Sequence, residues 1–104
     1  MPKGYWIGAY RSVTDLGKRT LYSELATVAV EAAGGRFLAR GGRVTAHEQG
    51  VAERTVIVEF DSYEQALAAY DSELYRKALD ALGDGVSRDH RIVEGVDLAV
   101  NALG

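Results

Sequence analysis

The sequence predicts an α+β fold in which one strand–helix–strand unit follows another, and three observations favour it. Residues 4–11 and 54–60 are rich in aromatic and β-branched side chains, which is typical of strands. Apolar residues recur at helical spacing over residues 15–33 and 62–82. The resulting order of strand, helix, strand, strand, helix, strand is that of the ferredoxin-like βαββαβ arrangement, an antiparallel sheet with two helices on one face.

The first strand is GYWIGAYR, which is bounded by turn-forming residues. The helix after it has Thr14 or Asp15 as its N-cap, and Gly34 is expected to end it in a left-handed conformation. The apolar side chains expected on the buried side of this helix are Leu21, Leu25, Val28, Ala29 and Ala32.

Two glycine pairs bracket the stretch GGRFLARGGR at residues 34–43. The first pair is expected to stop the helix, and the second to bulge a strand that spans residues 36–48. This strand and RTVIVEF, which begins at Arg54, form a hairpin. A phosphate cradle would need the glycines before a helix N-terminus, whereas here a strand continues, so the stretch does not predict a phosphate site.

The second helix begins at a capping box made by Ser62 and Gln65. We expect it to bend near Asp71, because Ser72 can cap a new turn before Gly83 ends the helix. Its apolar side chains are Ala66, Leu67, Tyr70, Leu74, Ala78, Leu79 and Leu82.

Residues 88–96 supply the last strand. We expect one domain over residues 1–104, with a core at residues 4–96 and a short C-terminal tail at residues 97–104 that has no clear assignment.

Composition excludes several classes of function. The chain has no cysteine, which excludes disulfides, thiolate catalysis and cysteine-containing metal sites. Its formal net charge of -3 argues against a nucleic-acid binder, and no apolar run approaches the roughly 18 residues of a membrane span. We therefore expect a soluble cytoplasmic protein with no nucleic-acid or membrane partner.

Positive charge gathers in the middle of the chain and negative charge after it. This asymmetry indicates either a local field suited to a small anion or a solvated strand edge and helix face. The arginines concerned are Arg36, Arg40, Arg43 and Arg54.

The sheet face away from the helices needs a cover. Strand alternation places Val56, Val58 and Phe60 on one face and Thr55, Ile57 and Glu59 on the other, and it separates Trp6, Gly8 and Tyr10 from Tyr5, Ile7 and Ala9. An open face carrying Trp6 and Ile57 would be a sizeable apolar patch. The sequence therefore predicts a homodimer whose sheets face one another.

Several segments together resemble the domain-of-unknown-function 1330 family of the dimeric α/β-barrel superfamily. They are GYWI, GGRFLARGGRV, TVIVEFDS, YDSELY and IVEGV, and the likeness spans residues 4–96. The resemblance implies a ferredoxin-like protomer, a dimer made by sheet-to-sheet packing, and a ligand held between the sheet and its helices or loops. Because the wider superfamily includes cofactorless monooxygenases, lactone isomerases and haem enzymes, it implies no particular reaction.

No motif for nucleophilic serine catalysis, for a phosphate loop or for a dinucleotide cofactor occurs in the sequence, so we expect no cofactor. His47 and His90 are the natural acid–base candidates, because imidazole titrates near neutrality. Neither has the spacing of a metal ligand, and His47 and Glu48 point to opposite sides of a strand. We expect no metal site.

Glu59 interrupts an apolar run in a strand that should be central, so its carboxylate needs a partner. Arg40, one strand away in the hairpin, is the expected partner. Two interpretations stay open: a fixed ion pair that specifies register, or a catalytic pair in the barrel cavity with Arg40 orienting a ligand and Glu59 transferring a proton.

Aromatic and polar side chains predict a ligand pocket, although aromatics at such spacing also form cores. Tyr75 or Ser72 could donate hydrogen bonds to a ligand carbonyl. The candidate ligand-binding residues are Trp6, Tyr10, Ser72, Tyr75 and His90, with Tyr70 as a further wall.

Two functions follow from these features. The first is a small-molecule-binding protein or cofactor-independent enzyme that transfers a proton on, isomerises or oxygenates a compact, oxygenated, anionic ligand. The second is a non-catalytic accessory or regulatory homodimer, in which Arg40 and Glu59 serve structure alone.

Overall fold

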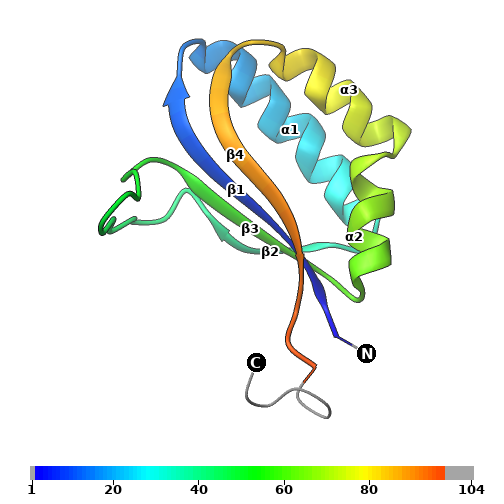
Figure 1. Ribbon diagram of the computed structural model, residues 1–104. Coiled ribbons are helices and arrows are strands. Elements are labelled where there is room, and N and C mark those ends of the chain that lie inside the picture. Colours follow the sequence, from blue (N-terminus) through cyan, green and yellow to red (C-terminus); the bar gives the residue numbers. More distant parts are fainter. Residues whose placement is uncertain (1, 98–104) are drawn as a thin grey trace.

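The computed structural model describes residues 2–97 (Figure 1). Its elements follow the expected ferredoxin-like order, with the second helix divided in two. They are β1 (Gly4–Val13), α1 (Leu16–Ala32), β2 (Arg36–Arg40), β3 (Thr55–Phe60), α2 (Tyr63–Tyr70), α3 (Glu73–Leu82) and β4 (Val86–Glu94). Of the expected tail, residues 98–104 lie outside the described part.

The strands form one antiparallel sheet in the order β2-β3-β1-β4, and the helices cover one face of it (Figure 1). In the registers of β1, Trp6 lies opposite Val58 and Ile92, and Ile7 lies opposite Ile57 and Arg91. Trp6 is 3% exposed and Val58 is 1% exposed, so their face is the one under the helices. We call the other side, which carries Ile7 and Ile57, the open face.

This register corrects one expectation. Trp6 and Ile57 do not share the open face, because the strand alternation places them on opposite sides of the sheet. Trp6 instead lies at the centre of the core, where its Nε1 donates a hydrogen bond to the backbone carbonyl of Ala66 at 2.8 Å. Its ring contacts Phe60 and Tyr75 at centroid distances of 5.1 and 4.7 Å.

Asp15 is the N-cap of helix α1, and its carboxylate accepts from the backbone N–H of Lys18 at 3.0 Å. Of the expected buried stripe, Ala29 is buried and Leu25 packs against the core, but Leu21 and Val28 are 49% and 56% exposed. The residues that face the core are Tyr22, Ala26, Ala29 and Val30. Three of these four side chains are small or β-branched. A prediction based on the large apolar side chains of the helix therefore chose the wrong positions.

The first glycine pair ends α1 as predicted. Gly34 has a φ of 78°, the left-handed conformation that glycine adopts without strain. The N–H of Gly34 donates to the carbonyl of Glu31 at 3.1 Å, and that of Gly35 donates to Val30 at 2.9 Å. These two bonds are those of a Schellman motif, which satisfies the last carbonyls of the helix.

The break between α2 and α3 occurs where the sequence indicates it. The Ser72 hydroxyl accepts from the backbone N–H of Tyr75 at 3.3 Å and so caps α3. At the start of α2 the Ser62 hydroxyl accepts from the N–H of Gln65 at 3.1 Å. The Gln65 side chain does not complete the capping box, because its Nε2 donates to the carbonyl of Ala33 at 2.8 Å and ties α2 to the end of α1.

The second glycine pair does not lie within a strand. Strand β2 ends at Arg40, and Gly41, with a φ of 75°, turns the chain out of the sheet. The bulge lies earlier, between Phe37 and Ala39. Residues 41–54 form a long loop that projects from the body of the protein (Figure 1).

Candidate functional site

A pocket lies between the helix-covered face of the sheet and α1. It has about 410 Å³ of unfilled space including its open mouth, of which about 30 Å³ admits the centres of water molecules. That inner space holds about two water molecules, so only a compact ligand fits unless the walls of the pocket move. Its walls are Trp6, Gly8, Tyr10, Tyr22, Ser23, Ala26, Val30, Phe37, Arg40, Arg54, Val56, Val58, Arg88 and His90.

The charge of the pocket is positive. Of the described residues that line it, Arg40, Arg54 and Arg88 carry guanidinium groups and none carries a carboxylate. Arg40 reaches α1, where its Nη1 donates to the Thr27 hydroxyl at 2.8 Å, and its guanidinium lies 3.9 Å from the centroid of the Phe37 ring. A cavity walled by one sign of charge favours a ligand of the other sign.

Arg54 belongs to the positive wall but is incompletely bonded. Burial, and then the positive charge of Arg19 nearby, lowers the pKa of Arg54. Within residues 2–97, the buried Nε atoms of Arg54 and Arg19 have no hydrogen-bond partner. Buried donors of this kind are normally satisfied, so a bound anion or water would complete their bonding.

Arg88 is held by two phenols. Its Nη1 donates to the Tyr22 hydroxyl at 3.0 Å and its Nη2 to the Tyr75 hydroxyl at 3.0 Å, while the two hydroxyls lie 2.6 Å apart. Burial alone would lower the pKa of Arg88, but the tyrosine oxygens outweigh burial and raise it. Burial raises the pKa of Tyr75 in turn, with Arg88 opposing. The positive charge of Arg88 is thus fixed beside the pocket.

His90 lies two positions along β4 from Arg88, on the same side of the strand. Burial, and then the positive charge of Arg88, lowers the pKa of His90 to about 4, which leaves the imidazole neutral near pH 7. Its ring lies 5.5 Å from each of the rings of Trp6 and Tyr70. Neither ring nitrogen has a hydrogen-bond partner among the described residues. The neutral imidazole therefore has one N–H and one acceptor nitrogen with which it can hydrogen-bond a ligand.

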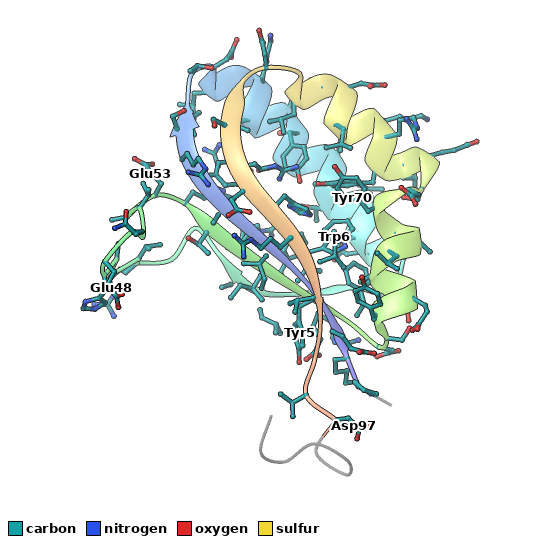
Figure 2. All side chains as sticks on the ribbon, viewed as in Figure 1. Tyr5, Trp6, Glu48, Glu53, Tyr70 and Asp97 are labelled. Atoms are coloured by element: carbon teal, nitrogen blue, oxygen red, sulfur yellow. The ribbon has the colours of Figure 1, made fainter. Side chains whose placement is uncertain are left out.

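The structure brings together most of the ligand-binding residues that the sequence predicts. Trp6, Tyr10 and His90 line the pocket. Tyr75 does not line it, but its hydroxyl is hydrogen-bonded to Tyr22 and Arg88, which do. Figure 2 shows Trp6 and Tyr70 pointing toward one another between the sheet and the helices, where their ring centroids are 6.0 Å apart. Ser72 does not line the pocket, because its hydroxyl caps α3 and donates to the carbonyl of Ala69 at 2.8 Å.

The expected pairing of Arg40 with Glu59 is wrong. In the register of the hairpin, Arg36 lies opposite Glu59 and Arg40 opposite Val56, so Arg40 faces the helices and Glu59 lies on the open face. The Arg36 Nε and Nη2 atoms donate to the Glu59 Oε1 at 3.1 and 2.9 Å. Glu59 also accepts from the Tyr5 hydroxyl at 3.3 Å. The predicted catalytic pair is thus divided by the sheet, and only Arg40 reaches the pocket.

Sequence reasoning did not select Tyr22 or Arg88 as site residues, and it named Arg54 only as one of four arginines in a possible field for a small anion. Arg88 and His90 alternate on one strand, which was a readable signal that both face the same side. Tyr22 carried no such signal, because it occupies a helical position next to the apolar stripe that was expected to be buried.

Among residues 2–97, no group of three or more histidine, aspartate or glutamate side chains could hold a metal ion. In the same part of the chain no helix is long and apolar enough to cross a membrane.

Solved structures with the same fold come from several bacteria. RPA0582, a protein of unknown function from Rhodopseudomonas palustris, has 12% identity and a TM-score of 0.72 over 92% of this chain and 84% of its own. SnoaB, a cofactor-independent oxygenase from Streptomyces nogalater, has 9% identity and a TM-score of 0.54 over 93% of this chain and 96% of its own.

A candidate antibiotic biosynthesis monooxygenase from Nitrosomonas europaea has 16% identity and a TM-score of 0.54 over 92% of this chain and 91% of its own. At these identities the likeness shows the fold alone. No curated protein is significantly similar to the chain in sequence. The model of the family DUF1330, a domain of unknown function, matches residues 3–96. The chain therefore belongs to the DUF1330 family, and it shares the ferredoxin-like fold of these solved structures.

Proposed function

We propose that the protein binds a compact organic anion in the pocket between the sheet and α1. The observation that carries this proposal is the wall itself: the described lining residues include Arg40, Arg54 and Arg88 without a carboxylate. Polar atoms of Arg54 and His90 are buried there without partners. A carboxylate oxygen supplies both the charge and the hydrogen-bond acceptors that these groups need.

The reaction that suits this pocket is proton transfer without a cofactor. His90 is the candidate general base, because its imidazole is neutral near pH 7. Burial and Arg88 lower its pKa to about 4, and the negative charge of a ligand bound beside it would raise that pKa and strengthen the base. Proton removal beside a ligand carbonyl gives an enolate, whose negative charge the arginines stabilise. Return of the proton to another carbon is isomerisation, and attack of the enolate on dioxygen is the first step of cofactor-independent oxygenation. SnoaB, which has the same fold, is a cofactor-independent oxygenase.

The first test of this proposal is anion binding with and without Arg54. In a thermal-shift series with acetate, glyoxylate, pyruvate and benzoate, at least one carboxylate should raise the melting temperature of the wild type by several degrees. A ligand at about 100 times its dissociation constant adds about 2.7 kcal/mol to the stability of the folded state. Arg54→Gln should weaken that ligand roughly 10-fold, the size expected for a charged hydrogen bond.

Arg43→Gln is the matched control for this test. It removes the same charge from the same loop, but Arg43 is exposed to solvent and does not line the pocket. Equal affinity of wild type, Arg54→Gln and Arg43→Gln for the same carboxylate would contradict the pocket as its site.

We also propose a homodimer in which the two open faces pack together. The centre of this face is apolar and its edges are charged, as in many protein interfaces. Ile7 and Ile57 are direct cross-strand neighbours at its centre. The ion pairs of Arg36 with Glu59 and of Arg91 with Asp89 flank them. Val93 of β4 is 47% exposed and would be covered by a second copy.

The dimer is tested by placing a charge at the centre of the open face. The wild type should sediment as a dimer, and Ile57→Glu as a monomer with an unchanged circular dichroism spectrum, because two buried carboxylates would face each other across the interface. Val28→Glu is the control, since Val28 is 56% exposed on α1 and lies away from that face. A wild type that sediments as a monomer would contradict this assembly.

A second function, that of a non-catalytic accessory or regulatory homodimer, has one observation in its favour. The inner space of the pocket, about 30 Å³, holds little more than water. On this interpretation the dimer forms, and none of the carboxylates shifts the melting temperature. The cytoplasmic location expected from the sequence stays a prediction that fractionation of cells would test.

A further inference from the structure

The hydroxyl groups of Tyr22 and Tyr75 form a short hydrogen bond, and the surroundings of the two side chains differ. Their oxygens are 2.6 Å apart, and each accepts one N–H of Arg88 at 3.0 Å. Tyr75 is 0% exposed and does not line the pocket, whereas Tyr22 does. The two phenols therefore have the same partners but differ in what else they can reach.

Counting the hydroxyl hydrogens fixes the direction of the pair. The pair contains two hydroxyl hydrogens, of which one fills the bond between the oxygens. If Tyr22 donated to Tyr75, the hydrogen of Tyr75 would be buried with no acceptor among the described residues, which costs free energy. If Tyr75 donates to Tyr22, that hydrogen is used, and the hydrogen of Tyr22 is left to point into the pocket. The second arrangement satisfies every donor once an acceptor enters the pocket.

We propose that Tyr22 is the directed hydrogen-bond donor of the pocket, with Tyr75 and Arg88 as positioning residues that set the direction of its hydroxyl. Each neighbour that donates to the Tyr22 oxygen polarises its O–H bond and makes it a stronger donor. This inference rests on the proposed function, because the acceptor for Tyr22 is an oxygen of the bound ligand.

The arrangement names the chemical class of that ligand. A donor strengthened by a guanidinium favours an oxygen with full or developing negative charge, such as that of a carboxylate or an enolate. A neutral amide of the same shape gains less from the donor and from the arginines. The pocket should therefore prefer acetate over acetamide, and Tyr22 should account for part of that preference.

The direction of the pair is tested without any ligand. In protein made with ¹³C-labelled tyrosine, the proton shared by the two oxygens should give a downfield hydroxyl resonance that exchanges slowly with water. It should correlate with the ring carbons of Tyr75 and disappear in Tyr75→Phe. Correlation with the ring carbons of Tyr22, or the absence of any protected hydroxyl proton, would overturn the proposal.

The role of the donor is tested by acetate titration followed by chemical shifts. Tyr22→Phe should weaken acetate roughly 10-fold or more and leave acetamide nearly unchanged, because it removes one hydrogen bond to a charged acceptor. Tyr75→Phe should weaken acetate less, because Tyr22 keeps its own hydrogen. The matched control is Tyr5→Phe, which removes the same atom from the open face, where the Tyr5 hydroxyl contacts Glu59.

The outcomes separate this inference from the proposed function. If acetate binds wild type and Tyr22→Phe equally, the pocket still takes an anion but Tyr22 is not its donor, and the inference fails. If no carboxylate binds the wild type, the proposed function fails, and the hydroxyl resonance still decides the direction of the tyrosine pair.

Discussion

Replacing Trp6 with alanine is expected to lower the free energy of unfolding by about 3–5 kcal/mol, the range for large aromatic truncations in a core. Trp6 is 3% exposed and its ring packs against Phe60, Tyr75 and His90. Its loss would leave a cavity at the centre of the sheet and would also leave the carbonyl of Ala66 without its side-chain donor. Because small domains are stable by only about 5–15 kcal/mol, the variant should be near the limit of folding.

Urea unfolding followed by circular dichroism measures this effect. Leu21→Ala provides a control of the same kind on α1, where the side chain is 49% exposed, and should cost well under 1 kcal/mol. Trp6→Phe separates the two parts of the effect, since it keeps an aromatic ring but removes the bond to Ala66. A Trp6→Ala variant as stable as Leu21→Ala would contradict the placement of Trp6 in the core.

Acidification from pH 7 to pH 4 should cost about 3 kcal/mol of stability through His90 alone. The pKa of His90 is lowered from 6.5 to about 4 by burial and then by Arg88. Between these two pH values the imidazole is therefore protonated in the unfolded chain but neutral in the folded protein. A depressed pKa means that the full contribution is present above about pH 6.5 and is lost as the pH falls toward about 4. The magnitude follows from about 1.36 kcal/mol for each unit of pKa.

The comparison of wild type with His90→Phe isolates this contribution. Phenylalanine keeps a ring beside Trp6 and Tyr70 but cannot titrate, so the stability of the variant should fall less between pH 6.5 and pH 4. Carboxylates distant from His90 titrate alike in both proteins and cancel in the difference, whereas Asp89 interacts electrostatically with His90 and does not cancel completely. Parallel stability curves for the two proteins would contradict a buried, neutral His90.

The parts of the fold that local chemistry decides were predictable from the sequence. Asp15, Ser62 and Ser72 each cap a helix because a short oxygen-bearing side chain can reach the N–H groups of the first turn. Gly34 ends α1 because its φ of 78° suits glycine. Strand alternation correctly separated Val58 from Ile57. All of these depend on neighbours within a few positions along the chain.

The candidate site depended on information that local chemistry does not contain. The bulge between Phe37 and Ala39 shifts the hairpin register, so it is Arg36 that meets Glu59 and Arg40 that turns toward α1. Nothing in the residues of β2 specifies that shift. The bond between Tyr22 and Arg88 joins residues 66 positions apart, and only tertiary packing decides such a contact.

The sheet order has a consequence for when the pocket comes into being. Strand β4 pairs with one edge of β1. That edge of β1 therefore stays unpaired until residues 86–94 are made. Arg88 and His90 arrive on that final strand. A nascent chain therefore exposes an aromatic strand edge, at which other chains can pair, until β4 has been made. The strand that pairs with this edge is also the one that carries Arg88 and His90 into the pocket.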